Sequence, residues 1–194
     1  MPNWTFNVLK VTDETQLDKK TLKKDGSKDE KASRKELKKF VEENILKKKT
    51  YDKDGNVNGE IDNEYELTFQ GSVPRPKSLD ISTPTHTDEE KKIAEDNLKK
   101  YGATDWYNWN CNNWGTKWDA NTHSVSDDSD YGEVFAHFDT AWSPPLAWLR
   151  EVSAKYPSLL FDMNVEEESN AFIGNPIARN GELCENITDI NYPS

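Results

Sequence analysis

Large apolar side chains are scarce in this chain of 194 residues, in which 34% of residues are hydrophobic and 31% are charged. No apolar run approaches the roughly 20 residues that a membrane-spanning helix requires. The first residues also lack the charged region and apolar stretch of a signal peptide, so a cytoplasmic location is expected. Two cysteines, Cys111 and Cys184, are too few for a disulfide framework, and reduced thiols are the simplest expectation.

Positive charge is also in short supply, because 25 lysine and arginine residues stand against 36 aspartate and glutamate residues, for a net charge of -11. Proteins that bind nucleic acid gain affinity through clustered Lys and Arg, so direct binding of nucleic acid is not expected. The acidity either maintains solubility or fits a basic partner, including the nucleic-acid groove of another protein. The sequence contains neither a glycine-rich phosphate loop nor an HExxH metal pair, so no cofactor is expected.

Tryptophan is the large apolar residue that the chain does contain. Seven tryptophans are present, four of them between Trp106 and Trp118, and a fifth is Trp142. Aromatic side chains bury large areas, so this cluster indicates where the core or a contact surface lies. Because other large apolar groups are few, we expect most tryptophans to be at least partly buried in a small core.

Hydrophobic periodicity predicts a series of strands and helices. Trp4, Phe6 and Val8 alternate with polar residues, which is typical of a half-buried strand. A helix is predicted next from Ser33 to Leu46, and the lysine run Lys47–Lys49 suits the negative end of this helix. A strand is predicted from Glu64 to Gln70, with Tyr65, Leu67 and Phe69 pointing inward. A second helix is predicted from Thr87 to Tyr101, with Ala94, Leu98 and Tyr101 on one face. A short helical or irregular segment is predicted from Trp106 to Trp114, followed by a strand that begins within Gly115–Ala120 and an acidic loop from Ser124 to Asp130. The last three elements are a strand from Glu133 to Thr140, a helix that begins at Pro144 after a Ser143 cap, and a strand from Leu159.

Without its insertions, the element order is strand, helix, strand, strand, helix, strand, which is the split βαβ or ferredoxin-like arrangement. The predicted fold class is therefore α+β, with an antiparallel sheet, helices on one face, and insertions between the first helix and the tryptophan segment. The chain is interpreted as a single domain, 1–194. Polar insertions are expected at about 12–32, 47–63 and 71–103, and a C-terminal hairpin at 170–184.

Several long motifs resemble a known family. They are Asn113-Trp-Gly-Thr-Lys-Trp-Asp-Ala120, Phe138-Asp-Thr-Ala-Trp-Ser-Pro-Pro145 and Tyr156-Pro-Ser-Leu159, with the opening Met1-Pro-Asn-Trp4 and Phe69-Gln-Gly-Ser-Val-Pro-Arg-Pro76. The chain is similar here to the YubB-like or Api-like proteins of bacteriophages and conjugative plasmids. The resemblance implies a ferredoxin-like domain of unknown function and a place in a bacterial host cell, and it assigns no catalytic residue. Thr5 stands where a cysteine is expected in the family, and the charged stretch from Thr12 to Glu30 matches nothing in it.

A set of polar and aromatic residues beside the tryptophans is the candidate ligand site. Its members are Asn113, Lys117, Trp118, Asp119, His137, Asp139 and Trp142. If the strands that carry Lys117 and His137 pair, their charged side chains converge, either as an aromatic pocket for a small molecule or as a structural network. The structural interpretation is favoured, because polar networks often fix the geometry of a domain with a small core.

One loop nearly fits the calcium-binding pattern of an EF-hand. Oxygen ligands fall at Asp54, Asn56, Asn58 and Asp62, but Tyr65 stands where the bidentate glutamate belongs. The flanking sequence is typical of a turn that enters a strand. We therefore interpret the loop as a polar hairpin and predict no metal site.

Two functions remain open. The first is a non-catalytic phage or mobile-element protein that binds and modulates a host protein, such as an anti-defence inhibitor of a defence or nucleic-acid-handling complex. The acidic residues available for such a partner are Glu42, Glu43, Asp88, Glu89, Glu90, Asp127, Asp128, Asp130, Glu166, Glu167 and Glu168. The alternative is a small-molecule or nucleotide binder, or a hydrolase, that uses Lys117, Asp119, His137 and Asp139.

Overall fold

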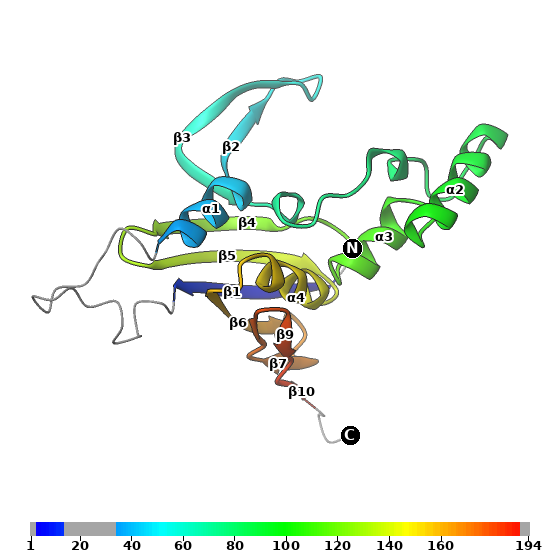
Figure 1. Cartoon of the computed structure of the whole chain (residues 1–194). Helices are drawn as coiled ribbons and strands as arrows, with labels where there is room; N and C mark the ends of the chain where they lie inside the picture. Colours follow the sequence, from blue (N-terminus) through cyan, green and yellow to red (C-terminus); the bar gives the residue numbers. More distant parts are fainter. Residues whose placement is uncertain (1–2, 14–33, 191–194) are drawn as a thin grey trace, which may run out of the picture.

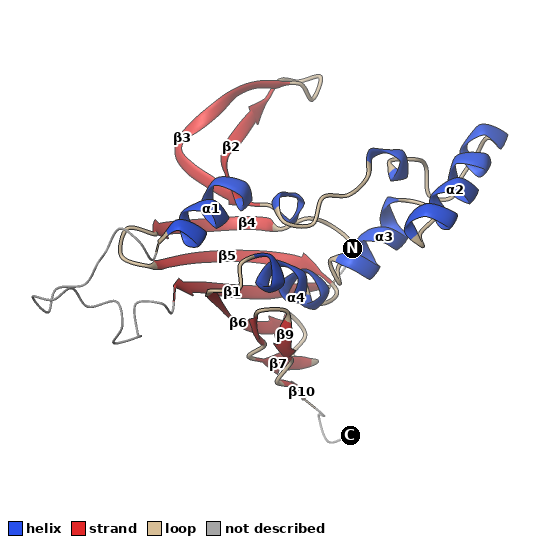
Figure 2. Ribbon diagram, in the orientation of Figure 1, coloured by secondary structure: helices blue, strands red, loops and turns tan. Residues whose placement is uncertain are grey.

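An antiparallel sheet forms the centre of the protein, seen here in a computed structural model that describes residues 3–13 and 34–190 (Figure 1). Four of its strands run in the order β6-β1-β5-β4, each antiparallel to its neighbour. Two helices, α1 and α4, pack on the same face of these strands (Figure 2). The elements of this unit are β1 (Trp4–Asp13), α1 (Lys35–Asn44), β4 (Asn121–Asp128), β5 (Glu133–Ala141), α4 (Leu146–Lys155) and β6 (Leu159–Glu167). This is the ferredoxin-like order, so the predicted α+β fold is confirmed.

The face of β1 that meets the helices is not the one with the aromatic residues. Leu9 and Val11 are buried, whereas Phe6 is 46% exposed and Trp4 is half-buried. The period of two predicted for this strand holds, but its buried side is formed by Thr5, Asn7, Leu9 and Val11. The aromatic side of β1 therefore lies on the sheet face opposite α1 and α4, which we call the open face.

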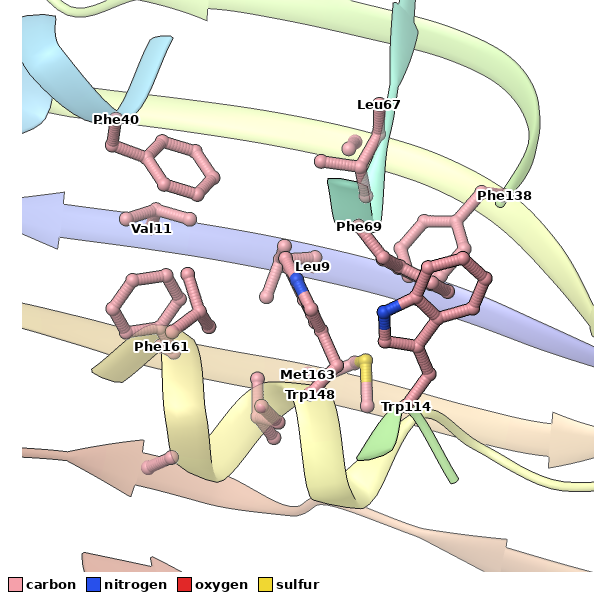
Figure 3. Packing of buried hydrophobic residues seen from close by; sticks show 14 of the residues in the cluster. Leu9, Val11, Phe40, Leu67, Phe69, Trp114, Phe138, Trp148, Phe161 and Met163 are labelled. Atoms are coloured by element: carbon pink, nitrogen blue, oxygen red, sulfur yellow. The ribbon is translucent and has the colours of Figure 1, made fainter. Parts of the chain in front are cut away.

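The core between the sheet and the helices is built from aromatic rings (Figure 3). Phe69 lies with its ring centroid 4.7 Å from that of Trp148 and 5.7 Å from that of Trp114. Phe40, from α1, packs edge-on against Phe161 of β6 at 5.6 Å. Each such ring buries a large apolar area, which compensates for the low apolar content of the chain.

The insertion that follows α1 is a two-stranded arm, β2 (Ile45–Tyr51) and β3 (Val57–Leu67), that extends away from the sheet (Figure 1). The lysine run predicted to end the helix instead lies in β2. Tyr65 is 39% exposed, so the prediction that it points inward is wrong, whereas Leu67 is buried as predicted. Phe69 is also buried, but in a short 3-10 turn, η3 (Phe69–Gly71), and not in a strand.

The second insertion contains the helix α2 (Asp88–Tyr101). Thr87 and Glu90 form the predicted capping box, and Gly102 ends the helix with a φ of 71°. Ala94 is buried as predicted, but Leu98 is 53% exposed. The predicted apolar stripe is therefore only partly buried, and the second buried residue of the helix is the polar Asn97.

The tryptophan segment contains the helix α3 (Trp106–Asn113), with Asp105 as its N-cap. No strand begins within Gly115–Ala120, since these residues form bends, and β4 occupies most of the segment predicted as an acidic loop. Helix α4 begins two residues later than predicted, at Leu146. Ser143 does not cap it, because the Ser143 hydroxyl donates to the carbonyl of Gly115 at 2.6 Å.

The C-terminal residues form four short strands, which are β7 (Phe172–Gly174), β8 (Ile177–Arg179), β9 (Glu182–Cys184) and β10 (Ile187–Asp189). The predicted hairpin at 170–184 is only partly correct. Strands β8 and β9 pair, but β7 pairs with β6 and β10 instead of β8. None of the described helices is long and apolar enough to cross a membrane.

Candidate functional site

Lys117 lies among three aromatic rings. Its ammonium nitrogen is 4.5 Å from the ring centroid of Trp118, 5.0 Å from that of Trp142 and 5.8 Å from that of Tyr107. Distances within about 6 Å allow cation–π attraction. Trp4 of β1 continues the group, since its ring centroid is 5.9 Å from that of Trp118. We call these five residues the aromatic surface, because Trp118 and Trp142 are 37% and 44% exposed.

The backbone holds Trp142 in an unusual conformation. This residue has a φ of 70°, a left-handed value that costs a bulky side chain about 1–2 kcal/mol. It follows β5 directly, and its backbone N–H donates to the carbonyl of Asn3 at 2.8 Å. The turn projects the indole toward Lys117 and Tyr107 instead of into the core. Strain that places an exposed aromatic ring in this way is typical of functional sites.

Asp119, predicted to converge with Lys117, has a structural role. Its carboxylate accepts hydrogen bonds from the Thr68 hydroxyl and from the Phe69 backbone N–H, both at 2.7 Å. Burial raises the pKa of the Asp119 carboxyl, partly opposed by these hydrogen bonds. The residue anchors η3, and with it the buried ring of Phe69, to the segment before β4.

Asp139 and His137 both lie on β5 but have different surroundings. Asp139 Oδ2 is 2.7 Å from Nε2 of His123, a β4 residue at the irregular register between Thr122 and Ser124. Asp139 is 8% exposed, whereas His137 is exposed and pairs in register with Val8 of β1. The condition for convergence, a strand carrying Lys117 that pairs with β5, is not met, and Asp119 and Asp139 have separate partners.

The remaining predicted members of the site divide between the two roles. Trp118 and Trp142 belong to the aromatic surface, whereas the Asn113 side-chain amide donates to the carbonyl of Trp109 at 2.9 Å and stabilises the end of α3. The sequence interpretation missed Trp4, Tyr107 and His123. The exposure of Trp4 could have been predicted. Leu9 and Val11 are apolar and lie on the opposite side of β1 from Trp4, so they indicate which side faces the core.

The acidic residues predicted as a partner surface are distributed over α1, the first turn of α2, the end of β4 and the end of β6. Several have partners within the chain. Glu43 pairs with Lys155 at 2.7 Å, Glu90 belongs to the capping box, and Glu167 is buried and accepts from Asn3. They form no single acidic surface, although Glu166 lies on the open face.

The calcium-like loop is the turn of the β2–β3 arm. The Asp52 carboxylate accepts from the backbone N–H groups of Asp54 and Asn56, both at 2.9 Å, and Asn58 accepts from Thr50. Within the described ranges, no group of three or more His, Cys, Asp or Glu residues is arranged to hold a metal ion. The loop geometry is therefore that of a polar hairpin.

Two surface grooves lie outside the aromatic surface. The larger, about 360 Å³, is bounded by the start of α4 and the C-terminal strands and includes Leu146, Arg150 and Phe172. The smaller, about 270 Å³, lies between the arm and β4 and includes Tyr65 and His123. Neither of these two grooves is lined by the charged set predicted to bind a small molecule.

A family model agrees with the fold over the C-terminal part of the chain. Residues 113–191 match a family model described as the ferredoxin-like domain in Api92-like protein. A solved structure, described as a protein api92 from Yersinia pseudotuberculosis, is similar over 100% of both chains, with 9% identity and a TM-score of 0.44. None of the curated proteins searched matches the chain. The C-terminal part of the chain is thus similar to an Api92-like ferredoxin-like domain, a domain class without an assigned chemistry.

Proposed function

We propose that this chain is a non-catalytic interaction protein that binds another protein through the open face and the aromatic surface. The single observation that carries the proposal is the group of exposed rings around Lys117. Tryptophan and tyrosine dominate the binding energy of protein interfaces. Here Trp142 is held toward solvent by a positive φ, and both Trp118 and Trp142 contact Lys117, although the chain has few large apolar groups to spare.

The open face is the second support for this proposal. Its central strands present Phe6 and Val8 from β1 and His137 from β5, and the contact between Trp4 and Trp118 makes it continuous with the aromatic surface. Exposed apolar groups that form a continuous patch, rather than single residues, are typical of interaction sites. The separate positions of Lys117, Asp119 and Asp139 give no comparable support to hydrolysis.

The partner we propose is a protein of the bacterial host, with the chain encoded by a phage or plasmid. The motivation is the resemblance to Api-like proteins together with the net charge of -11. A defence or nucleic-acid-handling complex offers a basic surface that an acidic protein can occupy. Modulation of such a complex requires only binding, so the proposal assigns no catalytic residue.

Affinity purification from bacterial cells tests the proposal. The tagged wild-type chain is compared with Trp118→Ala and with Leu98→Ala, which removes an exposed apolar side chain from α2. We expect a host protein to be retained by the wild type and by Leu98→Ala, and to be lost with Trp118→Ala. Recovery of no specific protein, or equal recovery with all three chains, would contradict the proposal.

A further inference from the structure

Phe6 stands between two carboxylates on the open face. In the sheet register Phe6 is opposite Asp139 of β5 on one side and opposite Glu166 of β6 on the other. Directly opposed residues of antiparallel strands have Cβ atoms about 4.5–5.5 Å apart. The exposed phenyl ring therefore has an acidic neighbour on each side, of which Glu166 is exposed, whereas Asp139 is buried and already contacts Nε2 of His123. We call these three residues the Phe6 row.

The same face shows what such an arrangement binds. Four residues further along β1, Lys10 places its ammonium nitrogen 5.4 Å from the ring centroid of Phe135 and 2.7 Å from a carboxylate oxygen of Glu133. A phenyl ring and a carboxylate there hold a cation from the chain itself. Over residues 3–13 and 34–190, no lysine or arginine lies over Phe6, and Glu166 has no ion pair.

Arginine fits the Phe6 row better than lysine does. Its planar guanidinium stacks on an aromatic ring and presents donors at its edge, so one group can contact the Phe6 ring and the Glu166 carboxylate together. Arg75 does this within the chain, since its guanidinium carbon is 5.7 Å from the ring centroid of Trp114 and a terminal nitrogen is 2.6 Å from Asp80. We infer that the Phe6 row is a receptor for an arginine side chain of a basic protein partner, an inference that rests on the proposed interaction function.

RNA is the competing occupant of such a face. Aromatic residues on the central strands of a four-stranded sheet stack on bases in one common class of RNA-binding domain. Those sites add positive charge that follows the phosphates. Here the exposed acidic neighbour of Phe6 is Glu166, which repels phosphate and attracts a guanidinium. Charge complementarity therefore favours a basic protein segment.

Binding of capped hexa-arginine and hexa-lysine peptides, measured by titration calorimetry at physiological salt, tests this inference. The wild-type chain is expected to bind the arginine peptide about fivefold more tightly than the lysine peptide. Phe6→Leu keeps an apolar strand residue and should bring this ratio to about one, and Glu166→Gln should weaken arginine binding several-fold. The matched control, Glu89→Gln, removes an equal charge from α2 and should change neither value.

Three results would overturn the inference. They are equal affinity for the two peptides, equal weakening by Glu89→Gln and Glu166→Gln, or binding of single-stranded poly(U) RNA that Phe6→Leu abolishes. If Phe6→Leu unfolds, the Glu166 carboxyl carbon in the wild type provides the readout, since its NMR shift should respond more to the arginine peptide than to the lysine peptide. If one of these results is found but a host protein is still captured by the wild type and lost with Trp118→Ala, the arginine site is refuted while the proposed interaction function stands.

Discussion

Trp4 and Trp118 are in contact, with ring centroids 5.9 Å apart and planes inclined at 41°. The first residue lies at the start of β1, and the second follows the tryptophan helix α3. Their contact joins the open face of the sheet to the rings around Lys117. A protein that presents both parts as one surface can engage a partner over a wider area than either part provides.

The contact between Lys117 and the rings of the aromatic surface should be detectable in solution. Ring currents from Trp118 and Trp142 are expected to shift the Lys117 side-chain methylene protons upfield of their usual NMR positions. Lys117→Met removes the charge and should lower the free energy of unfolding by about 1 kcal/mol, measured by urea denaturation. Lys99→Met is the control, because Lys99 is 76% exposed and lies over no ring. Ordinary methylene shifts together with an unchanged stability would contradict the contact.

The positive φ of Trp142 predicts an order of stability between two substitutions. Both Trp142→Ala and Trp142→Gly remove the indole, so they differ only in the backbone preference at a φ of 70°. Glycine adopts this conformation without a steric cost, and Trp142→Gly should be more stable than Trp142→Ala by about 1 kcal/mol in urea unfolding. If the alanine variant is equally stable or more stable, the turn does not hold this conformation in solution.

The capping box of α2 predicts a pH dependence. Hydrogen bonds from the backbone of His86 and from Ser82 lower the pKa of Glu90 from 4.5 to about 2. Because the pKa in the folded chain lies below the unfolded value, the stabilising contribution is fully present above pH 4.5 and is lost as the pH falls toward 2. A carbon-13 NMR titration of the Glu90 carboxyl should give a midpoint near pH 2. A midpoint near pH 4.5 would show that the box does not persist.

Tyr156 joins α4 to α1 through a buried hydroxyl. It donates to a Glu43 carboxylate oxygen at 2.6 Å and accepts from the Asn44 amide at 3.2 Å. Tyr156→Phe should lower the free energy of unfolding by about 1–2 kcal/mol, because both partners then lose a hydrogen bond in a buried region. Tyr131→Phe, at a residue that is 81% exposed, should have no effect. Equal stability of the two variants would rule out a structural role for this hydroxyl.

The element order was accessible from the sequence because the core strands β5 and β6 have a clear period of two. Val134, Ala136 and Phe138 are buried together, and so are Phe161 and Met163. These strands and the capped helices are local patterns that follow from backbone periodicity and end groups. The order of strands in the sheet then followed from the known ferredoxin-like arrangement, without any long-range signal in the sequence itself.

The candidate site was less accessible because it depends on contacts between distant residues. Lys117, Trp118 and Trp142 were recognised as candidates, but Tyr107 comes from α3, and no spacing indicates that it meets Lys117 and Trp142. Asp119 was misplaced because a bend, not a strand, precedes β4, so the side chain turns toward Thr68. In β1 the aromatic residues are the larger apolar groups, but Leu9 and Val11 on the opposite side of the strand are the ones that the sheet buries against the helices.

The central claim is that a protein partner covers the open face and the aromatic surface. Hydroxyl-radical footprinting of the complex with the captured host protein tests it most directly, because Phe6, Trp118 and Trp142 are all exposed and reactive in the free chain. The account predicts that the partner protects these three side chains, while Leu98 and Tyr131, which are exposed elsewhere, are labelled as before. Unchanged labelling of Phe6, Trp118 and Trp142, with protection at Leu98 or Tyr131 instead, would contradict it.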